Sequence, residues 1–122
     1  MLRKEMTKVE IEKELGGKGD FVLIDNMTRF LKENLPVDIK RFIYLKLTEI
    51  YEKRNMFFDA AEVYNRLVEI SLNQSDKVNY IVKEIECYIK AGLFDKADLA
   101  IKKVAGEAKA IDKQRIIKSI KE

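Results

Sequence analysis

The residues that most often carry chemistry are scarce in this sequence. It contains no histidine and one cysteine, Cys87, among 122 residues. Histidine is the most common general base and a frequent metal ligand, so its absence removes the most usual catalytic and metal-binding arrangements. Cys87 stands at an apolar position of a helical pattern, where we expect a buried thiol rather than a nucleophile. We therefore expect no enzymatic activity and no cofactor.

Two other sequence patterns could indicate a phosphate-binding loop or a pair of cooperating carboxylates, but a purely structural role is the better interpretation of both. The segment GGKGD at residues 16–20 has the glycines of a phosphate-binding loop. It lacks the strand and the Lys-Ser/Thr ending that such a loop needs, so a helix end followed by a linker is the better interpretation. Glu84 and Glu86 stand two residues apart, and on a helix their carboxylates would diverge, which prevents them from sharing a proton or a metal ion. We expect no metal site.

The composition is that of one globular domain. Hydrophobic residues make up 47% of the chain and charged residues 37%, whereas a disordered chain lacks the apolar surface that offsets its entropy. No segment approaches the roughly 18 apolar residues of a membrane span, and the charged N-terminus has no signal-peptide core. We expect a cytoplasmic protein that does not insert into a membrane. Many Lys, Glu and Ile residues with few Gln are typical of a thermophilic source.

Apolar residues recur at helical spacing along most of the chain, which predicts an all-α fold of about six helices. In the clearest one, 39–54, Ile39, Ile43 and Leu47 mark one face and Asn55 is a natural left-handed stop. The other expected helices span about 2–15, 21–34, 57–71, 77–91 and 96–108, and a last segment covers 112–122. The expected N-caps are Asp20, Asp38, Ser75 or Asp76, Asp95 and Asp112.

Two stretches of the chain match each other at a separation of 37 residues. The matched pairs are Leu45 with Val82, Tyr51 with Tyr88, Met56 with Leu93, Phe57 with Phe94, Ala60 with Ala97, Tyr64 with Ile101 and Leu67 with Val104. Self-similarity with a period of 20 to 50 residues indicates stacked supersecondary units, and here each unit would be a helical hairpin. Alanine lets two helices approach closely, while the large residues fill the space on either side.

At these positions the sequence resembles the tetratricopeptide repeat (TPR) family, over about residues 40–110. The residues that carry the resemblance are Tyr51, Asn55, Phe57, Ala60 and Tyr64 in one unit and Tyr88, Gly92, Phe94, Ala97 and Ile101 in the next. Glu84 departs from the pattern, because the family usually has leucine there. The resemblance implies a right-handed stack of antiparallel helical hairpins, a TPR-like α-solenoid. Another helical-hairpin solenoid is the alternative.

The same resemblance implies a division of the single domain 1–122. Residues 38–74 would form one repeat unit and 75–111 the next. An irregular helix pair, 1–36, would precede them, and 112–122 would be the start of a third unit or a capping helix.

The resemblance also implies a function, because such stacks usually hold another protein. If the first helix of each hairpin lines the concave surface, the groove carries Phe42, Lys46, Glu49, Lys53, Asn79, Lys83, Glu86 and Lys90. A charged groove of this kind would bind an extended or helical peptide, which makes the protein a scaffold or interaction module. The competing interpretation is that Glu49 with Lys53, and Glu86 with Lys90, are ordinary i,i+4 pairs that contribute about 0.3 kcal/mol each.

The C-terminal part suggests two alternatives and a contact between copies. Residues 102–122 carry seven Lys or Arg against three acids, as in a nucleic-acid-associated helical protein. The lysines lie between Ile and Ala at helical spacing, so we favour a solvated helical face and do not expect a nucleic-acid partner. The chain could also be a structural fragment of a longer solenoid. We expect Ile116, Ile117 and Ile120 to be covered by a second copy in a homodimer.

Overall fold

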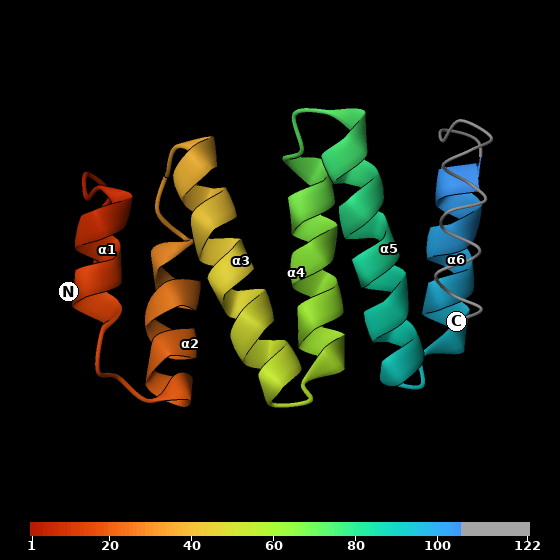
Figure 1. The fold of residues 1–122 in the computed structure, drawn as a ribbon, viewed down its shortest axis with the longest axis horizontal. Helices are drawn as coiled ribbons and strands as arrows, with labels where there is room; N and C mark the ends of the chain where they lie inside the picture. The colour runs from red at the N-terminus through yellow and green to blue at the C-terminus, as the bar shows by residue number, and fades with distance from the viewer. Residues whose placement is uncertain (106–122) are drawn as a thin grey trace.

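The computed structural model describes residues 1–105, which form six helices joined by short connections (Figure 1). The helices are α1 (Lys8–Leu15), α2 (Asp20–Phe30), α3 (Val37–Lys53), α4 (Phe57–Glu69), α5 (Gln74–Lys90) and α6 (Phe94–Ala105). These residues contain no strand, so the predicted all-α fold is confirmed for them. Asp112 and the proposed self-association residues Ile116, Ile117 and Ile120 lie outside the described residues.

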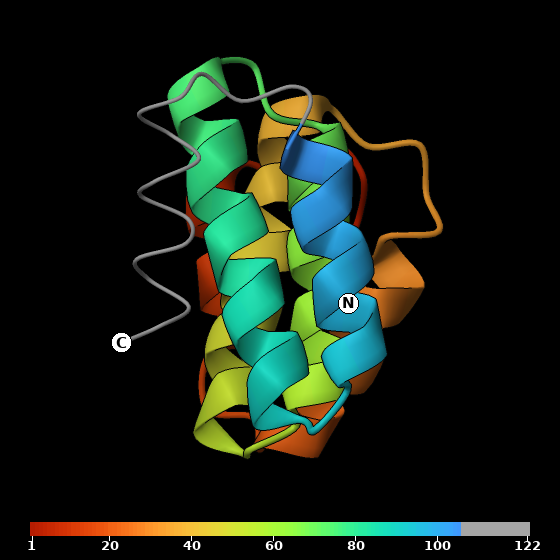
Figure 2. The ribbon, with the colours of Figure 1, turned by 90° about the vertical axis from the view of Figure 1, so that its right-hand side faces the viewer.

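The six helices stand in a row, and consecutive helices run in opposite directions (Figure 1). Along this row α4 packs against both α3 and α5, α5 packs against α6, and α2 contacts α3. Seen from one end of the row, α5 and α6 lie side by side (Figure 2). Each helix therefore contacts mainly the helices that precede and follow it in the sequence. Within the described residues, no helix is both long enough and apolar enough to cross a bilayer.

The helix boundaries recur at one interval. Helices α2, α4 and α6 begin at residues 20, 57 and 94, which are 37 residues apart. Helices α3 and α5 begin at residues 37 and 74 and end at residues 53 and 90, again 37 apart. This interval is the one found in the sequence comparison, and it also includes α2, which lies in the helix pair that the sequence suggested was irregular.

Helices α3 and α5 end in the same backbone motif. Asn55 has φ 59° and Gly92 has φ 76°, both in the left-handed region. The next residue donates its N–H back to the carbonyl five residues earlier, Met56 to Tyr51 at 2.7 Å and Leu93 to Tyr88 at 2.9 Å. This is a Schellman motif, which satisfies carbonyls left open at the helix end. Asn55 is a left-handed stop, as predicted.

The predicted N-caps Asp20, Asp38 and Asp95 are wrong by one or two positions. Helix α2 begins at Asp20, α3 begins at Val37 and α6 begins at Phe94, so the three aspartates lie inside the first turns. An acidic side chain there still interacts favourably with the positive end of the helix dipole, without bonding to a backbone N–H. Composition near a helix start therefore does not distinguish a cap from a first-turn residue.

Two other helix starts also differ from the prediction. Asn73, rather than Ser75 or Asp76, caps α5, and its side-chain oxygen accepts the N–H of Asp76 at 2.8 Å. Helix α1 begins at Lys8 and not at residue 2, because Thr7 and Glu10 form a capping box there. Asn73 belongs to the same polar turn as the predicted caps Ser75 and Asp76. The capping box at Thr7 is a sequence pattern that the prediction for α1 did not use.

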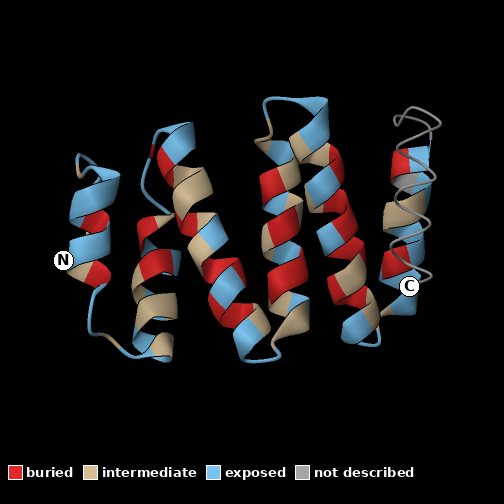
Figure 3. Ribbon diagram, in the orientation of Figure 1, coloured by how far each residue is buried: buried red, intermediate tan, exposed pale blue. Residues whose placement is uncertain are grey.

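The core runs continuously along the row of helices (Figure 3). Its fully buried side chains include Ile43 and Leu47 of α3, Leu67 of α4 and Ile85 of α5. Ala60 and Ala97, the small residues of the repeat pattern, are 0% and 3% exposed. The small side chains thus lie where neighbouring helices are packed together, as the pattern predicted.

Candidate functional site

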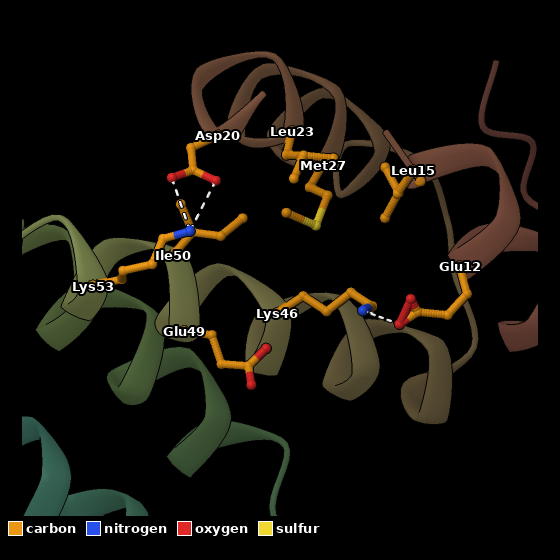
Figure 4. Close-up of a pocket in the computed structure, with 10 residues that line it drawn as sticks. Glu12, Leu15, Asp20, Leu23, Met27, Lys46, Glu49, Ile50 and Lys53 are labelled. Atoms are coloured by element: carbon orange, nitrogen blue, oxygen red, sulfur yellow. Dashed lines mark hydrogen bonds and ion pairs between the residues drawn. The ribbon is translucent and has the colours of Figure 1, made fainter. Parts of the chain in front are cut away.

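A cavity of about 480 Å³ lies between α1, α2 and α3 (Figure 4). Its apolar lining comes from all three helices, namely Leu15 of α1, Leu23 and Met27 of α2, and Ile50 of α3. Glu12, Gly16, Asp20, Lys46, Glu49 and Lys53 complete the lining. The cavity therefore has an apolar floor and charged groups of both signs around it.

The lysines at this cavity are held by acids from the two N-terminal helices. Lys46 of α3 forms an ion pair with Glu12 of α1. The ammonium of Lys53 lies 3.0 Å from a carboxylate oxygen of Asp20 at the start of α2, and Arg54 Nε lies 2.9 Å from the same oxygen. Hydrogen bonds from Lys53 and then Arg54 lower the pKa of Asp20 below its ordinary value. These ion pairs connect α1 and α2 to α3.

The predicted i,i+4 pairs are wrong. Lys53 binds Asp20 instead of Glu49, and Lys90 lies over the ring of Phe57, 5.3 Å from its centroid, instead of pairing with Glu86. Lys53 and Lys90 therefore contact residues of neighbouring helices rather than acids of their own helix. Partner choice here depends on how the helices stack and not on spacing along one helix.

The structure brings together three of the eight predicted groove residues. Lys46, Glu49 and Lys53 line the cavity, as described above. Phe42 is half-buried and lies beneath Lys46, 5.1 Å from the ammonium, but does not line the cavity. The four predicted residues of α5 lie outside the cavity lining, and they are Asn79, Lys83, Glu86 and Lys90. Lys83 and Lys90 are exposed and Glu86 is half-buried.

The sequence analysis missed the two acids of the site, Glu12 and Asp20, as partners of the α3 lysines. They stand 34 and 33 residues from Lys46 and Lys53, and no local pattern links the pairs. Their signal would have been the excess of acids on the first two helices opposite the lysines of the third. That signal becomes readable only once the order of helices in the row is known.

A polar cluster joins α3, α4 and α5, in which Tyr64 and Cys87 are buried and Glu52 is half-buried. Glu52 of α3 accepts a hydrogen bond from the hydroxyl of Tyr64 at 2.8 Å and one from the thiol of Cys87 at 3.7 Å. Cys87 is 1% exposed, as expected for a core thiol, and burial together with the Glu52 charge raises its pKa to about 12. A thiol with this pKa stays protonated near neutral pH and is a poor nucleophile.

Glu84, the departure from the repeat pattern, is also buried. It is 5% exposed and accepts a hydrogen bond from the side-chain amide of Asn65 on α4 at 3.1 Å. Burial raises the pKa of the neighbouring Tyr88, and the charge of Glu84 adds to this effect. The mismatch with leucine at this position was the signal in the sequence for a buried carboxylate.

The described residues offer no other arrangement that points to a particular chemistry. Within residues 1–105, no group of three or more His, Cys, Asp or Glu side chains is placed to hold a metal ion. Comparisons with protein-family models, curated proteins and solved structures found no match. The function is therefore inferred from the geometry of the cavity and from the repeated helix boundaries.

Proposed function

We propose that this protein is a non-catalytic binding module built from TPR-like helical hairpins, and that it holds a peptide or helix of a protein partner at the cavity between α1, α2 and α3. The observation that carries the proposal is the composition of this cavity. An apolar floor surrounded by fixed charges suits a peptide with one or two apolar side chains between polar ones. The α5 residues Lys83 and Lys90 would extend the contact along the neighbouring unit.

The repeated helix boundaries support the architectural part of this proposal. Helices that begin every 37 residues and contact mainly their sequence neighbours are expected of stacked hairpins. The resemblance at Tyr51, Asn55 and Phe57 gives the TPR-like version of such a stack. The right-handed turn of the stack and the role of its concave surface belong to the same proposal.

The state of the polar side chains supports a binding role over catalysis. The thiol of Cys87 is buried and protonated, and Lys46, Lys53 and Asp20 are held in ion pairs between helices. Such groups position neighbouring helices and a bound peptide. The charges would set the orientation of the peptide, and the small apolar surface that the floor still exposes, mainly at Leu23, would add to its affinity.

Selection from a random peptide library, followed by binding titrations, tests this proposal. Lys46→Glu should weaken a selected peptide by roughly tenfold or more, since it places a repelling charge beside Glu12 and Glu49. The double variant Glu12→Lys with Lys46→Glu keeps an ion pair between α1 and α3 but exchanges its ends. We expect it to retain wild-type thermal stability and still bind the peptide poorly.

The matched control is Lys102→Glu, an exposed lysine of α6 away from the cavity, which should leave binding unchanged. If the double variant bound every selected peptide as tightly as the wild type, the charged side of this cavity would not be the binding site. Loss of binding in the Lys102 variant as well would indicate a general charge effect instead.

A further inference from the structure

The most exposed phenylalanines of the described structure all lie at the start of a helix, Phe21 and Phe58 at matching positions of the 37-residue repeat and Phe94 one position earlier in its unit. Phe21 is 62% exposed, Phe58 43% and Phe94 62%, and each lies in the first turn of an even-numbered helix, α2, α4 or α6. Val22, beside Phe21, is 52% exposed. Large apolar side chains exposed at three helix starts are candidates for an interaction surface.

These three first turns lie along one edge of the molecule. Helices α2, α4 and α6 all begin at the lower edge in Figure 1, where the connections from α1, α3 and α5 arrive. The side view shows the turn between α5 and α6 at the same edge (Figure 2). We call this set of residues, Phe21, Val22, Phe58 and Phe94, the phenylalanine edge.

Cationic side chains lie directly beside the phenylalanine edge. The guanidinium of Arg54 lies 4.7 Å from the centroid of the Phe21 ring. The ammonium of Lys96 lies 5.6 Å from the centroid of the Phe58 ring, and Lys90 covers the adjacent Phe57. The three connecting segments, 16–22, 53–59 and 90–96, carry five Lys or Arg and three Asp, and one of the three, Asp20, is bound by Lys53 and Arg54. The edge is thus apolar and mildly basic.

We propose that the phenylalanine edge attaches the protein to the surface of an anionic membrane. Phenylalanine side chains would enter the boundary between headgroups and acyl chains, while Arg54, Lys90 and Lys96 would remain at the level of the lipid phosphates. A lipid surface fits better than an acidic peptide, because none of the three phenylalanines lines a described cavity. A peptide needs a groove to exclude water, whereas a bilayer needs only protruding side chains along an edge.

This attachment is distinct from the proposed peptide site and from a membrane span. The cavity between α1, α2 and α3 contains no residue of the phenylalanine edge. A peptide and a membrane could therefore be bound at the same time. Loss of one activity would not imply loss of the other.

The absence of tryptophan from the sequence allows a site-specific test. Phe21→Trp, Phe58→Trp and Phe94→Trp each place one reporter on the edge, and Leu72→Trp places one at an exposed position between α4 and α5 at the opposite edge. On vesicles that contain phosphatidylserine, the three edge reporters should shift their emission to shorter wavelength and the Leu72 reporter should not. Vesicles of phosphatidylcholine alone should bind more weakly, and added salt should weaken binding to the anionic ones.

Cosedimentation with the same vesicles completes the test. The triple variant Phe21→Ser, Phe58→Ser and Phe94→Ser should lose affinity by roughly tenfold or more, because little apolar surface would remain to bury. The control triple variant Val9→Ser, Leu72→Ser and Leu99→Ser removes exposed apolar residues elsewhere and should bind like the wild type. Equal binding by both triple variants, a blue shift of the Leu72 reporter, or no binding to anionic vesicles would each overturn the proposal. Binding of a polyglutamate peptide at the edge, with vesicles ignored, would also overturn it in favour of an acidic partner.

Discussion

The hydroxyl of Tyr64 donates a 2.8 Å hydrogen bond to the carboxylate of Glu52 and so joins α4 to α3 inside the protein. Through the thiol of Cys87, the same carboxylate also reaches α5. Glu52 is half-buried, and its two hydrogen bonds offset the contacts with water that its carboxylate loses there. Three helices thus share one polar contact, in addition to the contact between Asn65 and the buried Glu84.

Replacing Tyr64 by Phe should lower the free energy of unfolding by about 1 to 3 kcal/mol, because it removes a hydrogen bond from a buried tyrosine to a half-buried charged group. Tyr80→Phe is the matched control. Tyr80 stacks on Tyr64 with ring centroids 6.5 Å apart, but its hydroxyl has no hydrogen bond within the described part of the chain. Urea denaturation should separate the two variants. Equal stabilities would contradict the importance of the contact with Glu52.

Cys87 should make the protein less stable at alkaline pH. Its pKa is raised to about 12 in the folded protein, against about 8.5 in an unfolded chain, so only the unfolded chain releases the proton over this range. The stabilisation is complete below pH ~8.5 and decreases by up to about 1.4 kcal/mol per pH unit as the pH rises towards 12. The stability lead of the wild type over Cys87→Ala should therefore shrink between pH 8 and pH 10.5 in denaturant titrations. A constant difference would show that the thiol titrates normally.

Enlarging the small residues between helices should disturb packing. Ala60→Leu or Ala97→Leu should each cost on the order of 1 to 3 kcal/mol of stability, since both alanines are almost completely buried. Ala91→Leu adds the same side chain at an exposed position and should have little effect. Thermal melts followed by circular dichroism measure all three. If both buried variants melted at the wild-type temperature, the space around Ala60 and Ala97 would be large enough for a leucine side chain.

The two left-handed turns should respond to substitution in opposite ways. Gly92→Ala should lower stability by about 1 kcal/mol for conformational reasons alone, because an added Cβ would meet no atom within 4 Å. Asn55→Gly should leave stability unchanged or raise it, as glycine adopts this conformation without strain. Denaturant titration of both variants gives the answer. A stabilising Gly92→Ala would be inconsistent with φ 76° at that residue.

The parts of the fold that could be predicted from sequence are those set by local physics. Helical spacing placed Ile39, Ile43 and Leu47 in the core, because one face of an amphipathic helix must be buried. Asn55 marked a helix end because few residues other than Gly and Asn adopt the left-handed conformation there. Helix starts were less accurate, since an aspartate is favourable both as a cap and in the first turn.

The candidate site could be predicted only in part. Lys46, Glu49 and Lys53 were identified through their repeated positions on the first helix of a unit. Their partners Glu12 and Asp20 were not, because those ion pairs depend on which helices become neighbours. Glu84 was not expected to be buried, nor Glu52 to be half-buried, since a carboxylate leaves water only when other helices supply donors for it.

The helices are packed unevenly along the row, and this should determine which side of the candidate site opens most readily. The pair α4 and α5 is the most extensively packed, and α1 is the most lightly packed of the six described helices. In a row of this kind, local opening requires the least free energy where contacts are fewest. Amide protons of α1 should therefore exchange with solvent well before those of α4 and α5. The cavity is then lined on one side by a stably packed helix, α3, and on the other by a helix that opens more readily, α1. A ligand could therefore enter when α1 opens while the rest of the fold stays closed.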